Sequence, residues 1–332
     1  MNNRTAQDVR PDRVLGVASI AYLGPAGTFT EAALLQMIEA GLVPPHDADD
    51  WQPTPVDTNT AALDAVRAGA AEFACVPIEN SIDGSVMPTL DSLAIGTPLQ
   101  VFAEHTLDVA FSIVVKPGLT PADVGTLAAF PVAAAQVRRW LAVHLPDAEL
   151  RPANSNADAA QQVADGLVDA AVTSPLAATY RGLSALADGV VDEANARTRF
   201  VLVGRPAPPP PRTGADRTSV VLRIDNAPSA LVGALAEFGI RGIDLTRIES
   251  RPTRTELGTY VFFLDCVGHL DDDAVAEALR ALRRRCTDVR YLGSWPTGKI
   301  AGAPPPHPDD ASFWLAGLRA GSTGFPVDGS AE

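Results

Sequence analysis

Four short polar segments carry side chains that could hold an anionic substrate and move a proton. They contain Thr28, the pair Asn80 and Ser81, the pair Thr173 and Ser174, and the pair Thr198 and Arg199. Each of the first three segments follows an apolar run of strand type and precedes a run with helical spacing. The N-terminus of a helix offers free backbone N–H groups and a positive dipole end, which suit a carboxylate or a phosphate. The hydroxyl and amide groups can donate or accept hydrogen bonds at the same place.

Ordinary helix and turn chemistry explains several of these residues as well. Thr28 and Glu31 fit a capping box, in which the threonine caps a helix and the glutamate occupies its third position. Ser174 stands before a proline, as a helix N-cap often does, and Asn80 and Ser81 are typical turn residues. The residue types alone therefore leave capping and ligand binding both open.

Thr198 and Arg199 stand directly before residues 200–204, an apolar run that is typical of a buried strand. We expect this strand to return across two lobes and to place Thr198 in the cleft between them. Two interpretations of Arg199 stay open. It either ties the lobes together through a salt bridge or contacts a carboxylate of the substrate.

Three strand–loop–helix units must position these groups. We expect the strands at residues 19–23, 72–77 and 168–172, and the helices at residues 31–40, 87–93 and 175–180. Their order predicts an α/β fold with parallel sheets, in which ligands bind beyond the carboxyl ends of the strands. The two lobes are expected at about residues 17–96 with 185–205 and at about residues 97–184. A strand at residues 106–115 and a helix at residues 133–145 belong to this prediction.

A proline-rich segment at residues 206–216 separates this region from a second module. Residues 217–296 show strand and helix patterns in the order βαββαβ, which predicts a ferredoxin-like domain. Its second helix begins with three aspartates and ends with three arginines, in agreement with the helix dipole. Residues 297–332 are rich in Pro, Ala and Gly, and we expect them to be disordered apart from a weak helical pattern at 313–318.

Composition excludes several classes of function. The net charge is −14, from 26 basic and 40 acidic residues, without a dense basic block, so nucleic acid is not an expected partner. No apolar run is long enough to span a bilayer, and the first fourteen residues lack the apolar core of a signal peptide, so we expect a cytoplasmic protein. The five histidines and three cysteines show no metal-binding spacing, and we expect the cysteines to be packing residues.

The motifs together resemble prephenate dehydratase with a C-terminal ACT regulatory domain. The matching segments are residues 22–31, residues 77–81 with Gly84, Thr173-Ser174 with Ala177-Ala178, residues 198–200, and residues 249–252 in the second module. Several dispersed motifs in the same order are far more specific than any one of them. The resemblance covers about residues 18–295.

The resemblance implies that prephenate loses water and carbon dioxide to give phenylpyruvate in phenylalanine biosynthesis, without a cofactor or a metal. It implies a two-lobed catalytic domain like that of periplasmic binding proteins, and a homodimer or homotetramer inhibited by L-phenylalanine. Thr198 corresponds to the family's essential threonine. The substrate-binding residues implied are Thr28, Asn80, Ser81, Gln136, Thr173, Ser174 and Arg199. The implied phenylalanine site comprises Ser229, Ala230, Leu231, Glu249, Ser250, Arg251 and Pro252.

Two positions depart from the family pattern. Family members commonly have Ser-His-Pro-Gln where this chain has Ala129-Phe130-Pro131-Val132, so no role can be carried over for that serine or histidine. Either they are dispensable, or the cleft has gained an apolar wall. Ser229 replaces a glycine that is typical of the effector site. Two other functions stay open: dehydration of arogenate, and a non-catalytic two-lobed sensor of an amino acid or dicarboxylate.

Overall fold

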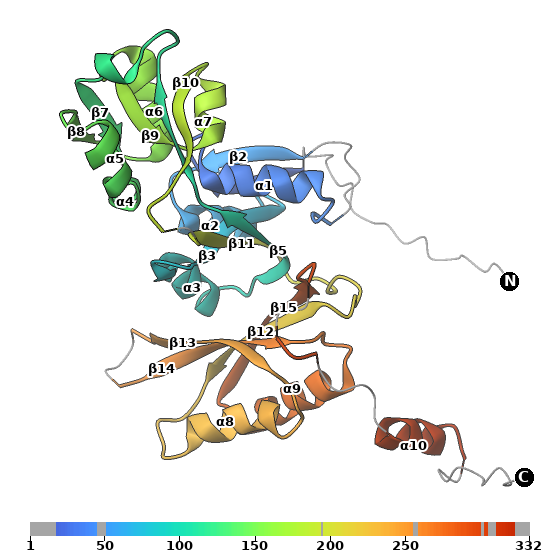
Figure 1. Ribbon diagram of the computed structural model, residues 1–332. Helices are drawn as coiled ribbons and strands as arrows, with labels where there is room; N and C mark the ends of the chain where they lie inside the picture. Colours follow the sequence, from blue (N-terminus) through green and yellow to red (C-terminus); the bar gives the residue numbers. More distant parts are fainter. Residues whose placement is uncertain are drawn as a thin grey trace, which may run out of the picture.

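The computed structural model describes residues 18–44, 51–193, 195–254, 258–299, 302–304 and 310–322. The described chain forms two lobes and a C-terminal domain below the first lobe in the view of Figure 1. Each of the three parts is built on its own sheet.

The first lobe contains a mixed sheet with the strand order β2-β1-β3-β11-β5, and β4 pairs with β3. The strands are β1 (Ser19–Leu23), β2 (Gln52–Val56), β3 (Phe73–Asn80), β4 (Gly84–Ser85), β5 (Gln100–Asp108) and β11 (Arg197–Gly204). The helices are α1 (Phe29–Glu39), α2 (Asn59–Arg67) and α3 (Met87–Ala94). Strand β1 is parallel to both neighbours, whereas β11 is antiparallel to β3 and to β5. The prediction of parallel sheets is therefore correct only in part.

The second lobe has a five-stranded sheet with the order β10-β6-β9-β7-β8. Its strands are β6 (Phe111–Val115), β7 (Thr126–Ala129), β8 (Glu149–Pro152), β9 (Ala170–Thr173) and β10 (Ser184–Val190). Its helices are η1 (Pro121–Asp123), α4 (Pro131–Gln136), α5 (Arg138–His144), α6 (Asn156–Asp165) and α7 (Pro175–Tyr180). The single helix expected at residues 133–145 is two helices, because the backbone of Val137 leaves the helical region at φ −123° and ψ 12°.

Both expected boundaries between the lobes, near residue 97 and near residue 185, differ from the structure. The strand expected at residues 106–115 is two strands, since β5 pairs with β11 in the first sheet and β6 pairs with β9 and β10 in the second. Strand β10 likewise lies in the second sheet. The chain thus passes between the sheets at residues 109–110 and again after residue 190, because backbone pairing, and not the apolar pattern, decides which sheet a strand joins.

The C-terminal domain has the predicted βαββαβ order. Its elements are β12 (Asp216–Arg223), α8 (Ala230–Gly239), β13 (Leu245–Pro252), β14 (Tyr260–Val267), α9 (Asp273–Arg285) and β15 (Asp288–Pro296). The antiparallel sheet has the order β13-β14-β12-β15. Successive strand residues point to opposite faces. Val220 and Leu222 therefore pack with Phe238 and Leu282 of the two helices, while Val221 faces the other way.

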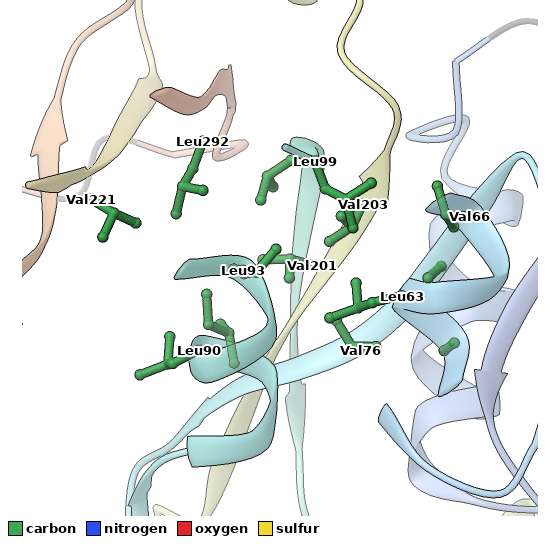
Figure 2. Close-up of a cluster of buried hydrophobic side chains, with 14 of the residues drawn as sticks. Leu63, Val66, Val76, Leu90, Leu93, Leu99, Val201, Val203, Val221 and Leu292 are labelled. Carbon is green, nitrogen blue, oxygen red and sulfur yellow. The ribbon is translucent and has the colours of Figure 1, made fainter. Parts of the chain in front are cut away.

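The face of this sheet that carries no helix is buried against the first lobe. Leu90, Leu93 and Leu99 of the first lobe share one apolar cluster with Val221 and Leu292 of the C-terminal domain (Figure 2). The two parts come so close at Gly293 that a Cβ atom there would lie 2.3 Å from the carbonyl oxygen of Val101. The φ of Gly293 is 134°, which also favours glycine. The domain is therefore packed onto the lobe and not merely tethered to it.

Of the chain after residue 296, residues 300–301, 305–309 and 323–332 lie outside the described residues. The described part of this tail contains helix α10 (Asp310–Arg319), which includes the weak helical pattern expected at 313–318. No helix within the described ranges is long and apolar enough to cross a membrane. Cys75, Cys266 and Cys286 are all buried, as expected of packing residues, and burial raises the pKa of the Cys266 thiol to about 12.

Candidate active site

Thr198 and Asn80 form a hydrogen-bonded pair on neighbouring strands. The Asn80 Nδ2 group donates to Thr198 Oγ1 at 2.9 Å. Asn80 Oδ1 accepts hydrogen bonds from the backbone N–H groups of Ile82, at 2.8 Å, and Asp83, at 2.9 Å. These two backbone donors fix the orientation of the amide, because only its oxygen can accept them. Thr198 Oγ1 must therefore act as acceptor toward Asn80, and its own hydroxyl proton remains available for another group.

Ser81 fixes the start of the strand that carries Thr198. Its hydroxyl donates to the carbonyl oxygen of Asn195 at 2.8 Å and accepts from the backbone N–H of Arg197 at 2.9 Å. Both capacities of the hydroxyl are thus used within the protein. Ser81 directly follows Asn80, so its hydrogen bonds to Asn195 and Arg197 support the Thr198–Asn80 pair from the adjoining turn.

Thr28 caps helix α1 as predicted. Its Oγ1 accepts from the backbone N–H of Glu31 at 3.3 Å and donates to the carbonyl oxygen of Leu23 at 2.9 Å. The Glu31 carboxylate differs from the predicted capping box, because it accepts from the backbone N–H of Gly27, at 2.5 Å, and not from that of Thr28. The cap is therefore real, and it holds the turn at the end of β1 in a fixed shape.

A cavity of about 810 Å³ opens between the lobes beside this turn. Thr28 and Phe29 line it from the first lobe, and Phe130, Asn156 and Asp158 line it from the second. Helices α1 and α6 both begin at this cavity, so their positive dipole ends face the same space. Phe130 contributes an aromatic side chain to the wall, in agreement with the apolar alternative for the family's histidine position.

Thr198 and Asn80 do not line this cavity, but they lie at the same edge of the first sheet. Strands β1 and β3 are parallel neighbours, and they end at Leu23 and Asn80. The carboxyl ends of both strands therefore meet at the side of the sheet that faces the second lobe, where ligands of α/β folds bind.

Thr173 and Ser174, which the family resemblance assigns to substrate binding, are fully buried in this structure. The Thr173 hydroxyl donates to the carbonyl oxygen of Asn156 at 2.6 Å. The Ser174 hydroxyl donates to the carbonyl oxygen of Gly27 in the first lobe and accepts from the backbone N–H of Ala177 at 3.1 Å. The Thr173 hydroxyl joins the end of β9 to α6 and the Ser174 hydroxyl joins one lobe to the other, and the assignment of both residues to substrate binding stays a prediction.

A second contact between the lobes lies beside Ser174. The Tyr180 hydroxyl donates to Glu31 Oε1 at 3.4 Å, and partial burial together with this carboxylate raises the pKa of Tyr180. Gly27 packs so tightly on α7 that an added Cβ atom would lie 2.8 Å from the Cβ of Ala177. The turn that carries Thr28 is therefore held by both lobes.

Gln136 ends helix α4 and has an unusual side chain. Its Oε1 atom is buried and lacks a hydrogen-bond partner among the described residues. Its backbone carbonyl oxygen accepts a hydrogen bond from the backbone N–H of Asp192 at 2.7 Å. A buried amide oxygen without a partner costs free energy, so Gln136 is a good candidate to accept a hydrogen bond from a bound ligand.

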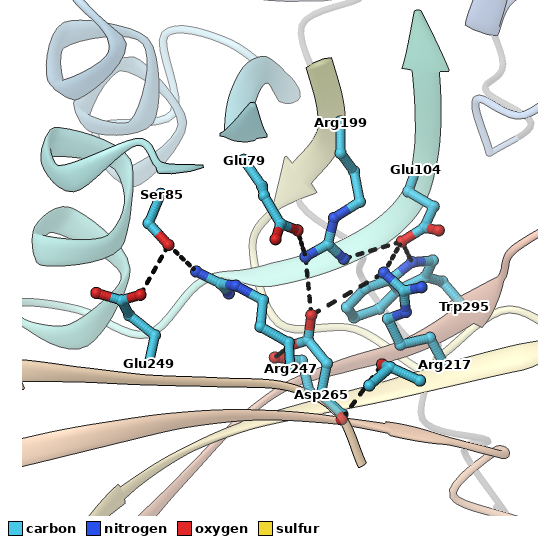
Figure 3. A network of polar contacts seen from close by, with 11 residues as sticks. Glu79, Ser85, Glu104, Arg199, Arg217, Arg247, Glu249, Asp265 and Trp295 are labelled. Carbon is cyan, nitrogen blue, oxygen red and sulfur yellow. Dashed lines mark hydrogen bonds and ion pairs between the residues drawn. The ribbon is translucent and has the colours of Figure 1, made fainter. Parts of the chain in front are cut away.

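The Arg199 side chain points to the opposite face of β11 from Thr198, toward the C-terminal domain. Its guanidinium contacts Glu79 and Asp265, each at 2.9 Å, and Glu104 at 3.3 Å (Figure 3). Burial alone would lower its pKa, but these carboxylates raise the pKa above its ordinary value. Glu79 and Glu104 lie in the first lobe and Asp265 belongs to β14, so these ion pairs do not connect the two lobes. Arg199 joins the first lobe to the C-terminal domain.

The residues expected to bind phenylalanine are divided between two faces of the C-terminal sheet. Glu249 accepts from Ser85 of the first lobe at 2.9 Å. Arg251 makes two hydrogen bonds of 3.0 Å to Asp91, also in the first lobe. The segment containing Ser229, Ala230 and Leu231 begins helix α8 on the opposite face, while Ser250 and Pro252 alternate with Glu249 and Arg251 along β13. A single chain therefore does not bring this set together.

Ser229 adopts a left-handed backbone conformation with a φ of 65°. Glycine adopts this conformation readily, whereas a serine there costs about 1 kcal/mol. The backbone thus keeps the shape that the family's glycine would take, although the side chain has changed.

Sequence reasoning did not identify Glu104 and Asp265, which together with Glu79 surround Arg199. Asp265 is an acidic residue within a strand that is otherwise apolar. A buried carboxylate is costly unless it is paired, so an acidic residue inside an apolar strand was a usable sign of an ion-pair partner. Nothing local indicated which arginine the partner would be. The described residues contain no cluster of three or more histidine, cysteine or acidic side chains suited to a metal.

Comparison with known proteins agrees with the geometry. Residues 20–208 match the family model of prephenate dehydratase, and residues 218–284 match that of the ACT domain. The chain is 79% identical over 302 residues to the prephenate dehydratase of Mycobacterium tuberculosis H37Rv, which covers 91% of this chain and 94% of the relative. It is 75% identical over 309 residues to that of Mycobacterium leprae, covering 92% and 96%.

Two solved structures extend the comparison. The prephenate dehydratase of Arthrobacter aurescens in complex with L-Phe has a TM-score of 0.80 and 41% identity, over 92% of this chain and 98% of that chain. GqqA, described as a novel type of quorum quenching acylase, has a TM-score of 0.74 and 31% identity, over 84% and 97%. The chain belongs to the prephenate dehydratase family, whose members are hydro-lyases, and it combines a two-lobed catalytic region of periplasmic-binding-protein type with an ACT domain.

Proposed function

We propose that this chain converts prephenate to phenylpyruvate with Thr198 as the hydrogen-bond donor to the departing hydroxyl group. The observation that carries this role is the Asn80–Thr198 hydrogen bond of 2.9 Å, in which Thr198 is the acceptor. Asn80 is itself fixed by two backbone donors. The Thr198 O–H is therefore oriented before the substrate arrives, and a donor that needs no reorganisation is the most effective kind.

The reaction requires little more than orientation and one donor. The ring carboxylate leaves as carbon dioxide, and its bonding electrons enter the ring as the C4–oxygen bond breaks. The departing oxygen takes up a proton and leaves as water, and aromatisation of the ring supplies the driving force. A threonine hydroxyl is a weak acid, so Thr198 stabilises the leaving oxygen by a hydrogen bond while solvent supplies the net proton. The proposal uses no cofactor.

Local positive potential supports the binding of this dianionic substrate to a chain with a net charge of −14. The N-termini of α1 and α6 meet at the 810 Å³ cavity and suit carboxylates. Gln136 Oε1, which is buried without a partner in the described part of the chain, suits a hydroxyl donor of the ligand. We therefore place substrate against Thr28 and Gln136 and beside the Thr198–Asn80 pair.

The test is turnover of prephenate by the purified protein, followed through the appearance of phenylpyruvate. Thr198→Ser should retain most activity because it keeps the hydroxyl, whereas Thr198→Ala and Thr198→Val should lose about a hundredfold or more. Full activity of Thr198→Val would refute the role of Thr198. Saturable binding of prephenate without turnover would favour the sensor, and faster turnover of arogenate would change the substrate. We prefer dehydration over acylase activity because identity to named dehydratases is 79%, against 31% to GqqA.

We further propose that L-phenylalanine inhibits this enzyme and that the cytoplasmic protein is a homodimer or homotetramer. The similar Arthrobacter aurescens protein was solved with L-Phe. Val232, Ile240, Ile248 and Tyr260 of the ACT domain are exposed apolar side chains, which suit a contact with a second copy. Light scattering that finds a monomer at micromolar concentration would contradict the assembly, and unchanged turnover in millimolar phenylalanine would contradict the inhibition.

A further inference from the structure

Strands β11 and β3 carry two functional pairs in succession. Thr198 lies opposite Asn80, and Arg199 lies opposite Glu79. The first pair points toward the edge where we place substrate, whereas the second points toward the C-terminal domain. The regular register breaks between Arg199 and Phe200, where the paired residue on β3 changes from Glu79 to Pro77. A bulge of this kind interrupts the ladder with β3, and on this side of β11 side-chain contacts add to the regular pairing with β5 from Arg197 to Leu202.

The contacts of Arg199 restrain β11 from three sides. Glu79 lies on β3, Glu104 on β5 and Asp265 on β14 of the ACT domain, and Figure 3 shows their carboxylates around one guanidinium. Only 1% of the Asp265 side chain is exposed. Its other oxygen accepts from Ser219 at 2.7 Å, so the carboxylate cannot rotate freely. The fixed point of the network is therefore a residue of the regulatory domain.

We propose that Asp265, acting with Glu79 through Arg199, is a positioning residue that holds the Thr198–Asn80 pair in its catalytic geometry. The proposal rests on the role of Thr198 given above. The bond from Arg199 to Asp265 sets the position of β11, and the bond from Arg199 to Glu79 fixes β11 against β3 immediately before Asn80. The ACT domain thereby contributes to the active site of its own chain, without touching substrate.

A purely stabilising role explains the network less well. The two parts already share an apolar cluster that includes Leu93, Val221 and Leu292. They are also joined by the pair of Asp91 and Arg251, whose side chains are 17% and 14% exposed. Burying an ion pair in addition gains little net stability, because desolvation offsets the attraction. What the network adds is directional hydrogen bonds on the strand that carries Thr198.

The experiment compares three isosteric variants of the full-length protein: Asp265→Asn, Glu79→Gln and the control Asp91→Asn. Asp91→Asn removes a charged contact between the same two parts, but that contact does not reach β11. We expect Asp265→Asn and Glu79→Gln to lower kcat about tenfold, as for one misdirected hydrogen bond, with KM unchanged within about twofold. Asp91→Asn should leave both constants unchanged in the absence of phenylalanine. The Glu79 side chain is 42% exposed, so we expect Glu79→Gln to fold even if Asp265→Asn does not.

Hydrogen exchange measured by mass spectrometry gives a second readout that does not depend on turnover. Exchange in the peptide covering residues 196–204 should rise in Asp265→Asn and stay at the wild-type level in Asp91→Asn. A folded Glu79→Gln or Asp265→Asn enzyme with wild-type kcat and wild-type exchange in this peptide would overturn the inference while leaving the proposed function intact. A wild-type protein that does not turn over prephenate would instead refute the proposed function.

Discussion

The buried position of Arg199 predicts a large loss of stability on its removal. In Arg199→Leu, the carboxylates of Asp265, 1% exposed, and Glu104, 9% exposed, lose one of the arginines that they share. Removing one member of a buried ion pair costs about 3–5 kcal/mol, because it leaves an uncompensated buried charge. Arg217 still contacts Glu104 at 3.0 Å and lies 4.0 Å from Asp265, which relieves part of this cost. We therefore expect a loss of about 3 kcal/mol.

Urea unfolding followed by circular dichroism and tryptophan fluorescence measures this loss as a change in the free energy of unfolding. Arg197→Leu is the matched control on the same strand. Arg197 pairs with Asp108 at 2.7 Å, but the two side chains are 55% and 78% exposed. An exposed pair of this kind contributes less than about 1 kcal/mol. The two arginines therefore differ in burial and in partners, although they are only two residues apart.

A double-mutant cycle separates the charge effect from lost packing. If the orphaned carboxylate causes the loss, then adding Asp265→Asn to Arg199→Leu should recover about 1–2 kcal/mol, since the two residues are in direct contact. The reasoning is refuted if Arg199→Leu is no less stable than Arg197→Leu. It is equally refuted if Arg199→Leu keeps wild-type stability and loses only substrate affinity, since that result would return Arg199 to the substrate site.

Three further predictions follow from individual contacts. Burial would raise the pKa of Asp265, but Arg199 and two further arginines hold the pKa below the ordinary value of 3.8. The resulting stabilisation is present above about pH 4 and is lost as the pH falls through the lower folded-state pKa. The free energy of unfolding should therefore decline more steeply on acidification in the wild type than in Asp265→Asn. Phe130→Ala removes part of the cavity wall, so KM for prephenate should rise several-fold with little change in kcat, and an unchanged KM would argue that Phe130 does not face substrate. Gly27→Ala places a Cβ atom 2.8 Å from the Cβ of Ala177 at a φ of 93°, so calorimetry should show a loss of about 1–3 kcal/mol, and wild-type thermal stability would contradict the tight contact between the lobes.

The sequence predicted the local features of the fold well. The caps at Thr28 and Ser174 and the order of the C-terminal domain follow from patterns that span only a few residues. Such features depend on short-range hydrogen bonding and on the periodicity of apolar residues, which a single stretch of chain contains. The motif resemblance likewise led to the family, because the motifs are short and stand in a fixed order.

The sequence failed where distant segments choose their partners. The patterns of β5 and β10 do not state which sheet each strand joins, and both were assigned to the wrong lobe. Thr173 and Ser174 carry the residue types of a binding site, yet their hydroxyls are used inside the protein because α6 and the first lobe pack against them.

Arg199 shows most clearly what the tertiary structure decided. Alternation along a strand gives Thr198 and Arg199 opposite faces, and the sequence alone contains that fact. The surroundings of Arg199 depend on its contacts with Asp265 and Glu104, which are 66 and 95 residues away in the sequence. The sequence thus determined that a hydroxyl and a guanidinium diverge from one strand. The packing of the C-terminal domain decided that the guanidinium meets buried carboxylates, because a buried charge requires a partner and only the folded chain brings one there.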